Sequence, residues 1–196
     1  MGKYIYLVVG ESGSGKTSLV NKMMELRGMT SIESYTTRLP RYKGEPGHIY
    51  VDEKGFNEIR NDLIAYTMFN GYEYGATKQQ VDTHDFYVID VAGIEYFYNT
   101  YNGDKIPIVV YVDASPFRRF IRMLKRGDSI KKALSRLEHD EKAFEDVYCY
   151  AHYRIINNGK MKDAVTKFST FIELMNQGFY EASDFPKRKG EYNDYK

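Results

Sequence analysis

A short glycine-rich segment is the first part of the sequence whose residue types suggest chemistry. Residues 10–17 read GESGSGKT and follow the apolar run YIYLVV. Glycines let the backbone curve around an anion with its N–H groups pointing inward, the lysine of such a loop reaches the β- and γ-phosphates, and the threonine hydroxyl can join a Mg²⁺ shell. Glycine-rich turns also arise by chance, but a strand before this loop and a helix after it favour a nucleoside triphosphate site. The pattern G-x-x-x-x-G-K-[ST] is met by Gly10, Gly15, Lys16 and Thr17.

A second cluster of polar residues, SYTTRLPRYKGEPGHIY, occupies positions 34–50. Arg38 and Arg41 are three residues apart, and guanidinium groups bind phosphate through two parallel hydrogen bonds. So dense a set of donors predicts a site for a second phosphate group, with a solvated charged loop as the alternative interpretation. The hydroxyl groups of the segment belong to Ser34, Thr36, Thr37 and Tyr50.

Alternating strands and helices must position these two segments. The apolar runs at residues 3–9, 86–93 and 106–114 are typical of strands that are covered on both faces, and HYRIINN is a short last strand. Helical spacing follows the first loop as far as Gly28, a plausible C-cap, and an amphipathic helix at 162–177 closes the core. Strands that alternate with helices predict an α/β fold with a parallel sheet flanked by helices.

Two other segments differ in texture from this core. Short aromatic runs broken by Gly and Pro predict a small inserted acceptor-binding region of mixed, largely antiparallel β structure. Charged helical patterns on both sides of Arg126-Gly127-Asp128 predict a helical lid with a mobile hinge. We therefore expect one domain over residues 1–196, with a core at 1–30, 85–115 and 148–176, the insertion at 31–84, the lid at 116–147 and a weakly ordered tail at 177–196.

Composition limits the class of protein and its partners. The chain is 42% hydrophobic with a net charge of +1, so no overall charge draws it to nucleic acid or to an anionic membrane. The single cysteine, Cys149, excludes an intramolecular disulfide, and no apolar stretch approaches the roughly 20 residues of a membrane span. We expect a cytoplasmic protein without a signal peptide, monomeric or homodimeric, whose partners are small-molecule nucleotides.

Taken in order, these segments resemble the guanylate kinase family of nucleoside monophosphate kinases as far as about residue 175. GESGSGKT looks like the family's phosphate loop, and SYTTRLPRYKGEPGHIY is similar to its signature S-x-T-T-R-x-x-R-x-G-E-x-x-G-x-x-Y. YEYGAT resembles the segment Y-G-[ST], and VIDVAG resembles the strand-end pattern D-x-x-G. RMLKRGDSIKKALSRL is similar to the lid pattern R-L-x-x-R-G with its later arginine, and HYRIINN to the late strand that ends in N-[DN].

The resemblance implies an ATP-dependent phosphotransferase that uses Mg²⁺. It implies catalytic roles for Lys16, Arg41, Arg122 and Arg136. ATP would be bound by Gly10, Ser12, Gly13, Ser14, Gly15, Lys16, Thr17, Ser18, Arg126 and Asn157. The acceptor nucleotide would be bound by Ser34, Arg38, Arg41, Tyr50, Tyr74, Thr77 and Asp90. Thr17, and Asp90 through water, would hold the metal. The alternative role of Asp90 is a simple helix cap. Asn157 and Asn158 could instead form an ordinary turn.

Other positions depart from the family pattern. The glutamate that accepts from the guanine N1–H and amino group in the family is Ala65 here. A later hydroxyl of the family is Ala76, with the adjacent Thr77 as a stand-in. The residues that would recognise the base therefore differ from the family pattern, whereas the phosphate-binding residues match it. An earlier strand acid is Val88, and a shifted alignment would make Glu73 or Asp62 the missing carboxylate.

Three functions follow from these observations. The first is a kinase that moves the γ-phosphate of ATP to GMP or dGMP. The second is a kinase of the same build that acts on another or a modified nucleoside monophosphate, which Ala65 and Ala76 favour. The third is a non-catalytic interaction module, against which the complete glycine loop argues, because such modules typically lose it.

Overall fold

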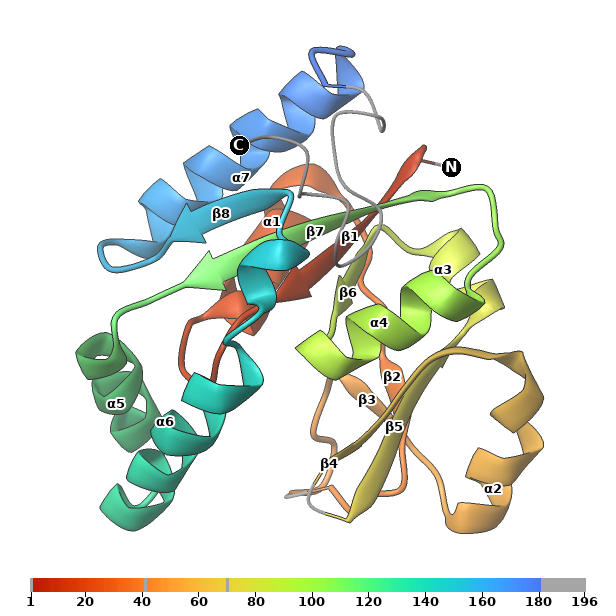
Figure 1. The fold of residues 1–196 in the computed structure, drawn as a ribbon, viewed down its shortest axis with the longest axis horizontal. Coiled ribbons are helices and arrows are strands. Elements are labelled where there is room, and N and C mark those ends of the chain that lie inside the picture. Colours follow the sequence, from red (N-terminus) through yellow and green to blue (C-terminus); the bar gives the residue numbers. More distant parts are fainter. Residues whose placement is uncertain (1, 41, 70, 181–196) are drawn as a thin grey trace.

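The computed structural model describes residues 2–40, 42–69 and 71–180 (Figure 1). Within these ranges the larger sheet has four parallel strands in the order β6-β1-β7-β8. The register pairs Val8 of β1 with Val88 of β6 and with Val110 of β7, so the carboxyl ends of these strands lie at one edge. The predicted α/β class with a parallel sheet is confirmed. The strands are β1 (Tyr4–Val9), β6 (Phe86–Val88), β7 (Ile106–Asp113) and β8 (Tyr153–Ile156).

Helices cover both faces of this sheet (Figure 1). Successive strand residues point to opposite faces, so Tyr6 and Val8 pack with Phe168 on one face, whereas Leu7 packs with Phe97 on the other. Burial on both faces explains why β1 is apolar throughout its length. The helices of the first face are α1 (Lys16–Arg27) and α7 (Met161–Asn176), and those of the second are α3 (Lys78–Thr83) and α4 (Val91–Thr100).

The smaller sheet lies between α1 and α3 in the sequence and has the strand order β3-β2-β5-β4. Its pairs are antiparallel except for β2 and β3, which run parallel with Ser34 opposite His48 and Thr36 opposite Tyr50. The inserted region of mixed β structure is therefore present. Its elements are β2 (Ser34–Thr36), β3 (His48–Tyr50), α2 (Glu53–Glu58), the short 3₁₀ helix η1 (Arg60–Asp62), β4 (Leu63–Phe69) and β5 (Tyr72–Thr77).

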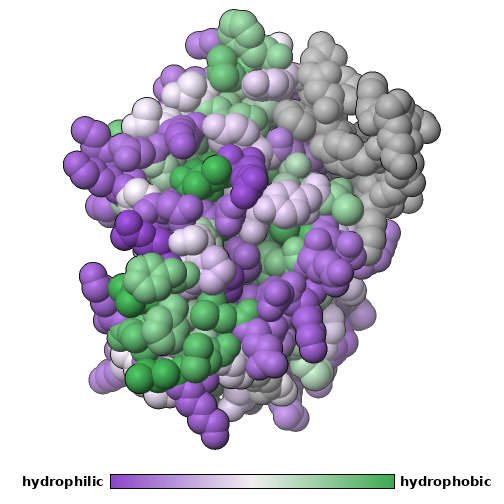
Figure 2. Space-filling model, turned by 60° about the vertical axis from the view of Figure 1, so that its left-hand side comes forward, coloured by the Kyte–Doolittle hydropathy of each residue, from purple (hydrophilic) through white to green (hydrophobic). Residues whose placement is uncertain are grey.

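Two helices, α5 (Pro116–Lys125) and α6 (Ile130–Ala143), form the predicted hairpin at the carboxyl edge of the parallel sheet (Figure 1). The chain turns between them at Gly127, whose φ of 97° lies in the left-handed region that favours glycine. Figure 2 shows apolar surface gathered low on the face where these helices come forward. The exposed apolar side chains that the two helices carry are Phe117, Ile130 and Leu134.

The structure corrects one predicted strand boundary, and most of the predicted tail lies outside the described residues. The apolar run at 86–93 is not one strand, because β6 ends at Val88 and Asp90 caps α4 by accepting a hydrogen bond from the Gly93 N–H. None of the helices in the described part of the chain combines the length and apolar character that a bilayer span requires. A second 3₁₀ helix, η2 (Val147–Cys149), precedes β8. The predicted tail falls largely on residues 181–196, which lie outside the described residues.

Candidate active site

The glycine loop leaves the carboxyl end of β1 and enters α1 at Lys16. Gly13 and Gly15 adopt φ values of 78° and 95°, so both occupy the left-handed region that non-glycine residues rarely enter. The loop closes on itself through a hydrogen bond from the Ser14 N–H to the Glu11 carbonyl, at 3.1 Å. The result is a curved loop directly before a helix N-terminus, where backbone N–H groups and the helix dipole favour an anion.

Lys16 is half-buried at the start of α1, with Nζ 3.5 Å from the Glu11 carbonyl oxygen. Burial lowers the pKa of Lys16 to about 8. The negative charges of Asp140 and Glu11 oppose this shift, so they help to keep the ammonium group protonated. The ammonium form therefore predominates at neutral pH, as binding to phosphate oxygens requires.

Arg122 and Asn157 hold the loop from outside. Arg122 Nη1 donates to the Ser14 carbonyl at 2.9 Å and Nη2 donates to the Asn157 carbonyl at 2.7 Å. Asn157 Nδ2 donates to the same Ser14 carbonyl at 2.8 Å. Asn157 is only 1% exposed, and the contact with ATP that the resemblance implies stays a prediction. In this structure both residues shape the phosphate loop, and the catalytic role of Arg122 stays a prediction.

Thr17 and Ser18 are exposed in the first turn of α1. Asp90 follows β6, and the pairing of Val8 with Val88 brings it to the same edge of the sheet as the loop. Its Oδ1 accepts from the Gly93 N–H at 2.6 Å, so the predicted alternative, a helix cap, is present. The described residues contain no cluster of His, Cys, Asp or Glu that forms a complete metal cage. A hydroxyl and one carboxylate fit Mg²⁺, which keeps several waters and is usually completed by substrate phosphates.

The acceptor-binding candidates line one face of the smaller sheet. The register places Ser34 opposite His48 and Thr36 opposite both Tyr50 and Tyr74, so these side chains point to the same side. Ser34 Oγ hydrogen-bonds His48 Nδ1 at 2.9 Å. The His48 ring lies 5.6 Å from that of Tyr74 between centroids. The predicted residues Ser34, Tyr50 and Tyr74 are thus brought together.

Arg38 belongs to this group but is held by a carboxylate. Nη2 and Nη1 donate to the two oxygens of Glu45 at 3.0 and 3.1 Å, and both side chains are largely buried. Nη2 also donates to the Tyr50 hydroxyl at 3.3 Å. The hydrogen bond that Arg38 donates to Glu45, together with the negative charge of that carboxylate, raises the pKa of Arg38 further above its usual value. Arg41, predicted to act beside Arg38, lies outside the described residues.

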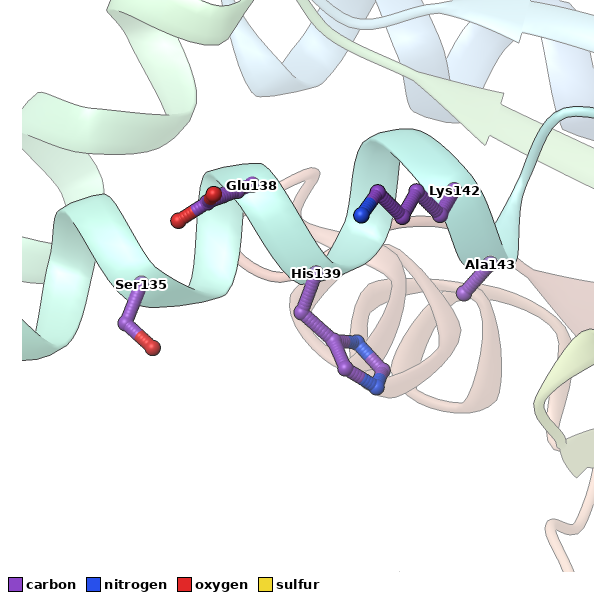
Figure 3. A pocket seen from close by; sticks show the side chains of 5 residues that line it. All are labelled: Ser135, Glu138, His139, Lys142 and Ala143. Atoms are coloured by element: carbon purple, nitrogen blue, oxygen red, sulfur yellow. The ribbon is translucent and has the colours of Figure 1, made fainter.

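Two further lid arginines lie at the end of α5 and on α6. Arg126 forms an ion pair with Asp128, which also lies 3.6 Å from Lys132 Nζ. Arg136 is half-buried on α6 and close enough to lower the pKa of Asp128. A shallow cavity of about 500 Å³, open to solvent, follows the flank of this helix (Figure 3). Its lining residues are Ser135, Glu138, His139, Lys142 and Ala143.

The lid and the smaller sheet meet beside this cavity. The His139 ring of α6 lies 5.8 Å from the Phe69 ring of β4 between centroids, in an edge-on arrangement. Phe69 and Ala65 are four residues apart on β4, so their side chains point to the same face of the sheet. The lid thus approaches the same face of the sheet that Tyr74 occupies.

Comparison with known proteins decides which family this geometry represents. A model of the guanylate kinase family matches residues 2–175. The chain belongs to the guanylate kinase family. The guanylate kinase of Legionella pneumophila (strain Lens) is 33% identical over 92 residues, which are 44% of this chain and 44% of that relative. The match thus spans less than half the length of that relative. The guanylate kinase of Thermotoga maritima is 28% identical over 175 residues, 82% of each chain.

The fold of a solved family member agrees with that of this chain. The crystal structure of guanylate kinase from Anaplasma phagocytophilum superposes with a TM-score of 0.60 at 21% identity, covering 92% of this chain and 89% of that one. The predicted fold, a parallel sheet flanked by helices with a separate mixed sheet, is therefore that of the guanylate kinase family.

Two of the departures from the family pattern lie at one point of the smaller sheet, whereas the third, Val88, ends β6 of the parallel sheet. Ala65 and Ala76 are directly opposite each other on β4 and β5, and they are 1% and 0% exposed. Glu73 does not replace the family's guanine-reading acid, because it lies on the opposite face and accepts from Arg60 at 2.6 Å and from Tyr66 at 3.1 Å. At this point the face is therefore apolar.

Thr77 has a different role from the predicted acceptor contact. It follows Ala76 on β5 and therefore points to the other face of the sheet. Its side chain accepts from the Gln80 N–H, and the Gln80 side chain accepts from the Thr77 N–H at 3.1 Å, which is a capping box at the start of α3. The prediction that Thr77 replaces the hydroxyl missing at Ala76 is therefore wrong. The spacing T-x-x-Q, read as a helix start, was the available signal.

Sequence analysis also missed four residues of the guanylate kinase site. His48 and Glu45 lie within the quoted signature, and the two-residue spacing of His48 and Tyr50 on a strand indicates a shared face. Arg119 and Asp140 contact the phosphate loop from α5 and α6. No local pattern signals these last contacts, because their partners are more than 100 residues away in the chain.

Proposed function

We propose that this chain transfers the γ-phosphate of ATP to GMP or dGMP, giving ADP and GDP or dGDP. One observation carries the proposal. A complete phosphate loop with Lys16 at a helix N-terminus occurs in the same chain as a second sheet whose face gathers Ser34, Tyr50 and Tyr74. The first feature suits a triphosphate, and the second supplies donors for a monophosphate.

The residues of the chain perform this transfer by binding and orientation. Lys16 and the backbone N–H groups of the loop bind the β- and γ-phosphates. The Ser12 and Ser14 N–H groups donate within the protein, to Asp140 and to the Glu11 carbonyl, so this role belongs to the remaining N–H groups of the loop. Arg38 and Tyr50 hold the acceptor phosphate. Arg41 and Arg136 neutralise charge that spreads over the transferring oxygens, so no covalent enzyme intermediate is needed.

Mg²⁺, when bound together with ATP, would supply charge neutralisation and alignment. We propose that Thr17 donates its hydroxyl oxygen to that ion and that Asp90 reaches it through water. The support is the chemistry of the two side chains and their place at one edge of the sheet.

A second candidate is transfer to another or a modified nucleoside monophosphate. The buried pair Ala65 and Ala76 supports it, because a carboxylate that pairs with guanine donors would otherwise stand there. Losing such a charged hydrogen bond weakens discrimination by about 1.5–3 kcal/mol. The interaction-module alternative loses support, because Gly15 and Lys16 retain the loop geometry that a module without nucleotide binding does not need.

ADP release, measured in a coupled assay with GMP, dGMP, AMP, dTMP and CMP as acceptors, tests the proposal. We expect GMP or dGMP to give the highest kcat/KM. Lys16→Ala removes the point charge on the phosphates and should abolish transfer while the fold persists, since the residue is only half-buried in the first turn of α1 and alanine favours a helix. Lys22→Ala, on the exposed face of the same helix, is the matched control and should behave as the parent. Turnover of Lys16→Ala within about threefold of the parent contradicts the role.

We further propose that residues 1–196 form a single guanylate-kinase-like domain with the core, insertion, lid and tail boundaries given above. The cytoplasmic location rests on the single, partly buried Cys149 and is likewise a proposal. Assembly as a monomer or a homodimer can be distinguished by light scattering at several protein concentrations.

A further inference from the structure

Four residues form a buried polar cluster under the phosphate loop, here called the loop clamp: Glu11, Ser12, Arg119 and Asp140. Arg119 is 4% exposed and Asp140 is 7% exposed. Arg119 Nη2 donates to Asp140 Oδ2 at 2.6 Å. The same carboxylate oxygen accepts from the Ser12 N–H at 2.7 Å, and the Ser12 carbonyl accepts from Arg119 Nε at 3.0 Å. The Ser12 N–H is thus bonded to a residue of α6, and the Ser12 carbonyl is bonded to a residue of α5.

The contacts of the clamp point toward the loop. Arg119 Nη1 lies 3.4 Å from Glu11 Oε1, and Ser12 Oγ lies 3.5 Å from Asp140 Oδ1. Close packing accompanies these bonds, because a Cβ on Gly13 would lie 2.6 Å from the Arg119 carbonyl oxygen. The exposed ring of His139 reaches the same carboxylate at 3.8 Å from the solvent side. The backbone of the phosphate loop is therefore seated directly on α5 and α6.

Stability alone does not account for such a pair. Removing two charges from water costs about as much as their attraction returns, and apolar residues of similar volume often serve the fold equally well. What an apolar pair cannot do is bond the Ser12 N–H and carbonyl. The loop clamp therefore fixes a backbone position rather than adding net stability.

The clamp also fixes the lid relative to the loop. Asp140 is four residues after Arg136 on α6, so the two side chains share a face of the helix. Arg119 is three residues before Arg122 on α5, and both donate to loop carbonyls. The bases of both lid helices are bound to residues 11–14, and Arg136 takes its position from that attachment.

From this arrangement we infer that Arg119 and Asp140 are positioning residues for phosphoryl transfer. They seat the loop on the lid helices, so that Arg136 and the bound triphosphate keep a fixed geometry. The inference rests on the proposed function, in which the loop binds ATP and Arg136 acts on the transferring group. In this role Arg119 and Asp140 act through the Ser12 backbone and not on the substrate itself.

The decisive variant replaces both charges at once. Arg119→Met combined with Asp140→Leu leaves no unpaired buried charge, so the protein is expected to fold with a melting temperature near that of the parent. It loses both bonds to Ser12. We expect kcat to fall about 10- to 100-fold, since a displacement of about 1 Å at the reacting atoms has effects of that size. The KM for GMP should change less than about threefold, because the smaller sheet is untouched.

Conservative and distant variants complete the experiment. Asp140→Asn keeps an oxygen for the Ser12 N–H, so its kcat should lie between those of the parent and the double variant. Lys22→Met with Glu25→Leu removes an exposed ion pair of α1 and should leave kcat unchanged. A folded Arg119→Met, Asp140→Leu protein with the parent's kcat overturns the inference.

Hydrogen exchange gives a readout that needs no catalysis. The Ser12 N–H and the N–H groups of 130–143 should exchange faster in the double variant than in the parent, whereas those of β1 should not change. Equal exchange at Ser12 overturns the inference. If the parent phosphorylates no nucleoside monophosphate, the proposed function fails, and the exchange result still decides whether the clamp holds the loop.

Discussion

Replacement of Gly15 by alanine tests how the phosphate loop is built. Gly15 has a φ of 95°, and a Cβ there would lie 2.6 Å from Asn157 Nδ2. The left-handed conformation costs a non-glycine residue about 1–2 kcal/mol. The Asn157 amide must also move, which weakens its hydrogen bond to the Ser14 carbonyl, a bond with a net value of about 0.5–1.5 kcal/mol. The free energy of unfolding should therefore fall by about 1.5–3.5 kcal/mol.

The matched control is Gly28→Ala. Gly28 has a φ of 64° at the end of α1, and a Cβ there meets nothing within 4 Å, so only the backbone strain applies. Urea unfolding should show that Gly15→Ala loses more stability than Gly28→Ala. At about 2–4 °C per kcal/mol, the melting temperature of Gly15→Ala should fall by about 3–14 °C. Equal losses in the two variants would refute the contact between Gly15 and Asn157.

Four further outcomes are expected. Arg38→Ala should raise the KM for the acceptor much more than the KM for ATP in steady-state assays, and a selective loss of ATP affinity reverses its assignment. Arg136→Ala should act chiefly on kcat, because its group reaches the phosphate only when the site is assembled; an unchanged kcat leaves it a structural residue. Ala65→Glu should raise the preference for GMP over AMP at least about tenfold in kcat/KM, because a buried acid again accepts from guanine, and an unchanged ratio shows that another group reads the base. Burial acts to raise the pKa of Asp128, but the hydrogen bond and charge of Arg126 lower it overall, so its contribution to stability is present at neutral pH and lost as pH falls through the lowered pKa. Asp128→Asn should accordingly unfold more easily than the parent at neutral pH but not in strong acid, and a constant difference across pH contradicts the ion pair.

The parts of the fold that sequence predicted well are those with a local signal. The apolar run before the glycine loop fixes a buried strand, and the helix that follows it stops at Gly28, whose left-handed conformation is the expected C-cap. The run at 86–93 was predicted to be one strand, although β6 ends at Val88, because two local signals conflict there. Asp90 and Gly93 form a helix start whose capping spacing was present but was overridden by the apolar residues around it.

Contacts between distant segments were beyond sequence reasoning. The carboxylate of Asp140 reaches the loop only because two helices fold back over it, and nothing in its neighbours distinguishes it from the other charged residues of α6. The side on which Glu73 lies depends on strand register, since a shift of one residue reverses the face of every side chain. The spacing that placed Tyr74 toward the acceptor therefore also placed Glu73 away from it.

The pairing of Arg38 with Glu45 has a consequence for turnover. Both terminal nitrogens of the guanidinium are bonded to the carboxylate, so an arriving monophosphate must compete with an internal anion for the same donors. Only molecules in which the Arg38 guanidinium is released from Glu45 bind the monophosphate at full strength. The apparent dissociation constant is therefore the intrinsic one divided by the fraction of such molecules. In the proposed acceptor site, Glu45 would pair with Arg38 again once the diphosphate product leaves. A site built this way would give up part of its affinity for the acceptor, and the same competition would weaken the binding of the product.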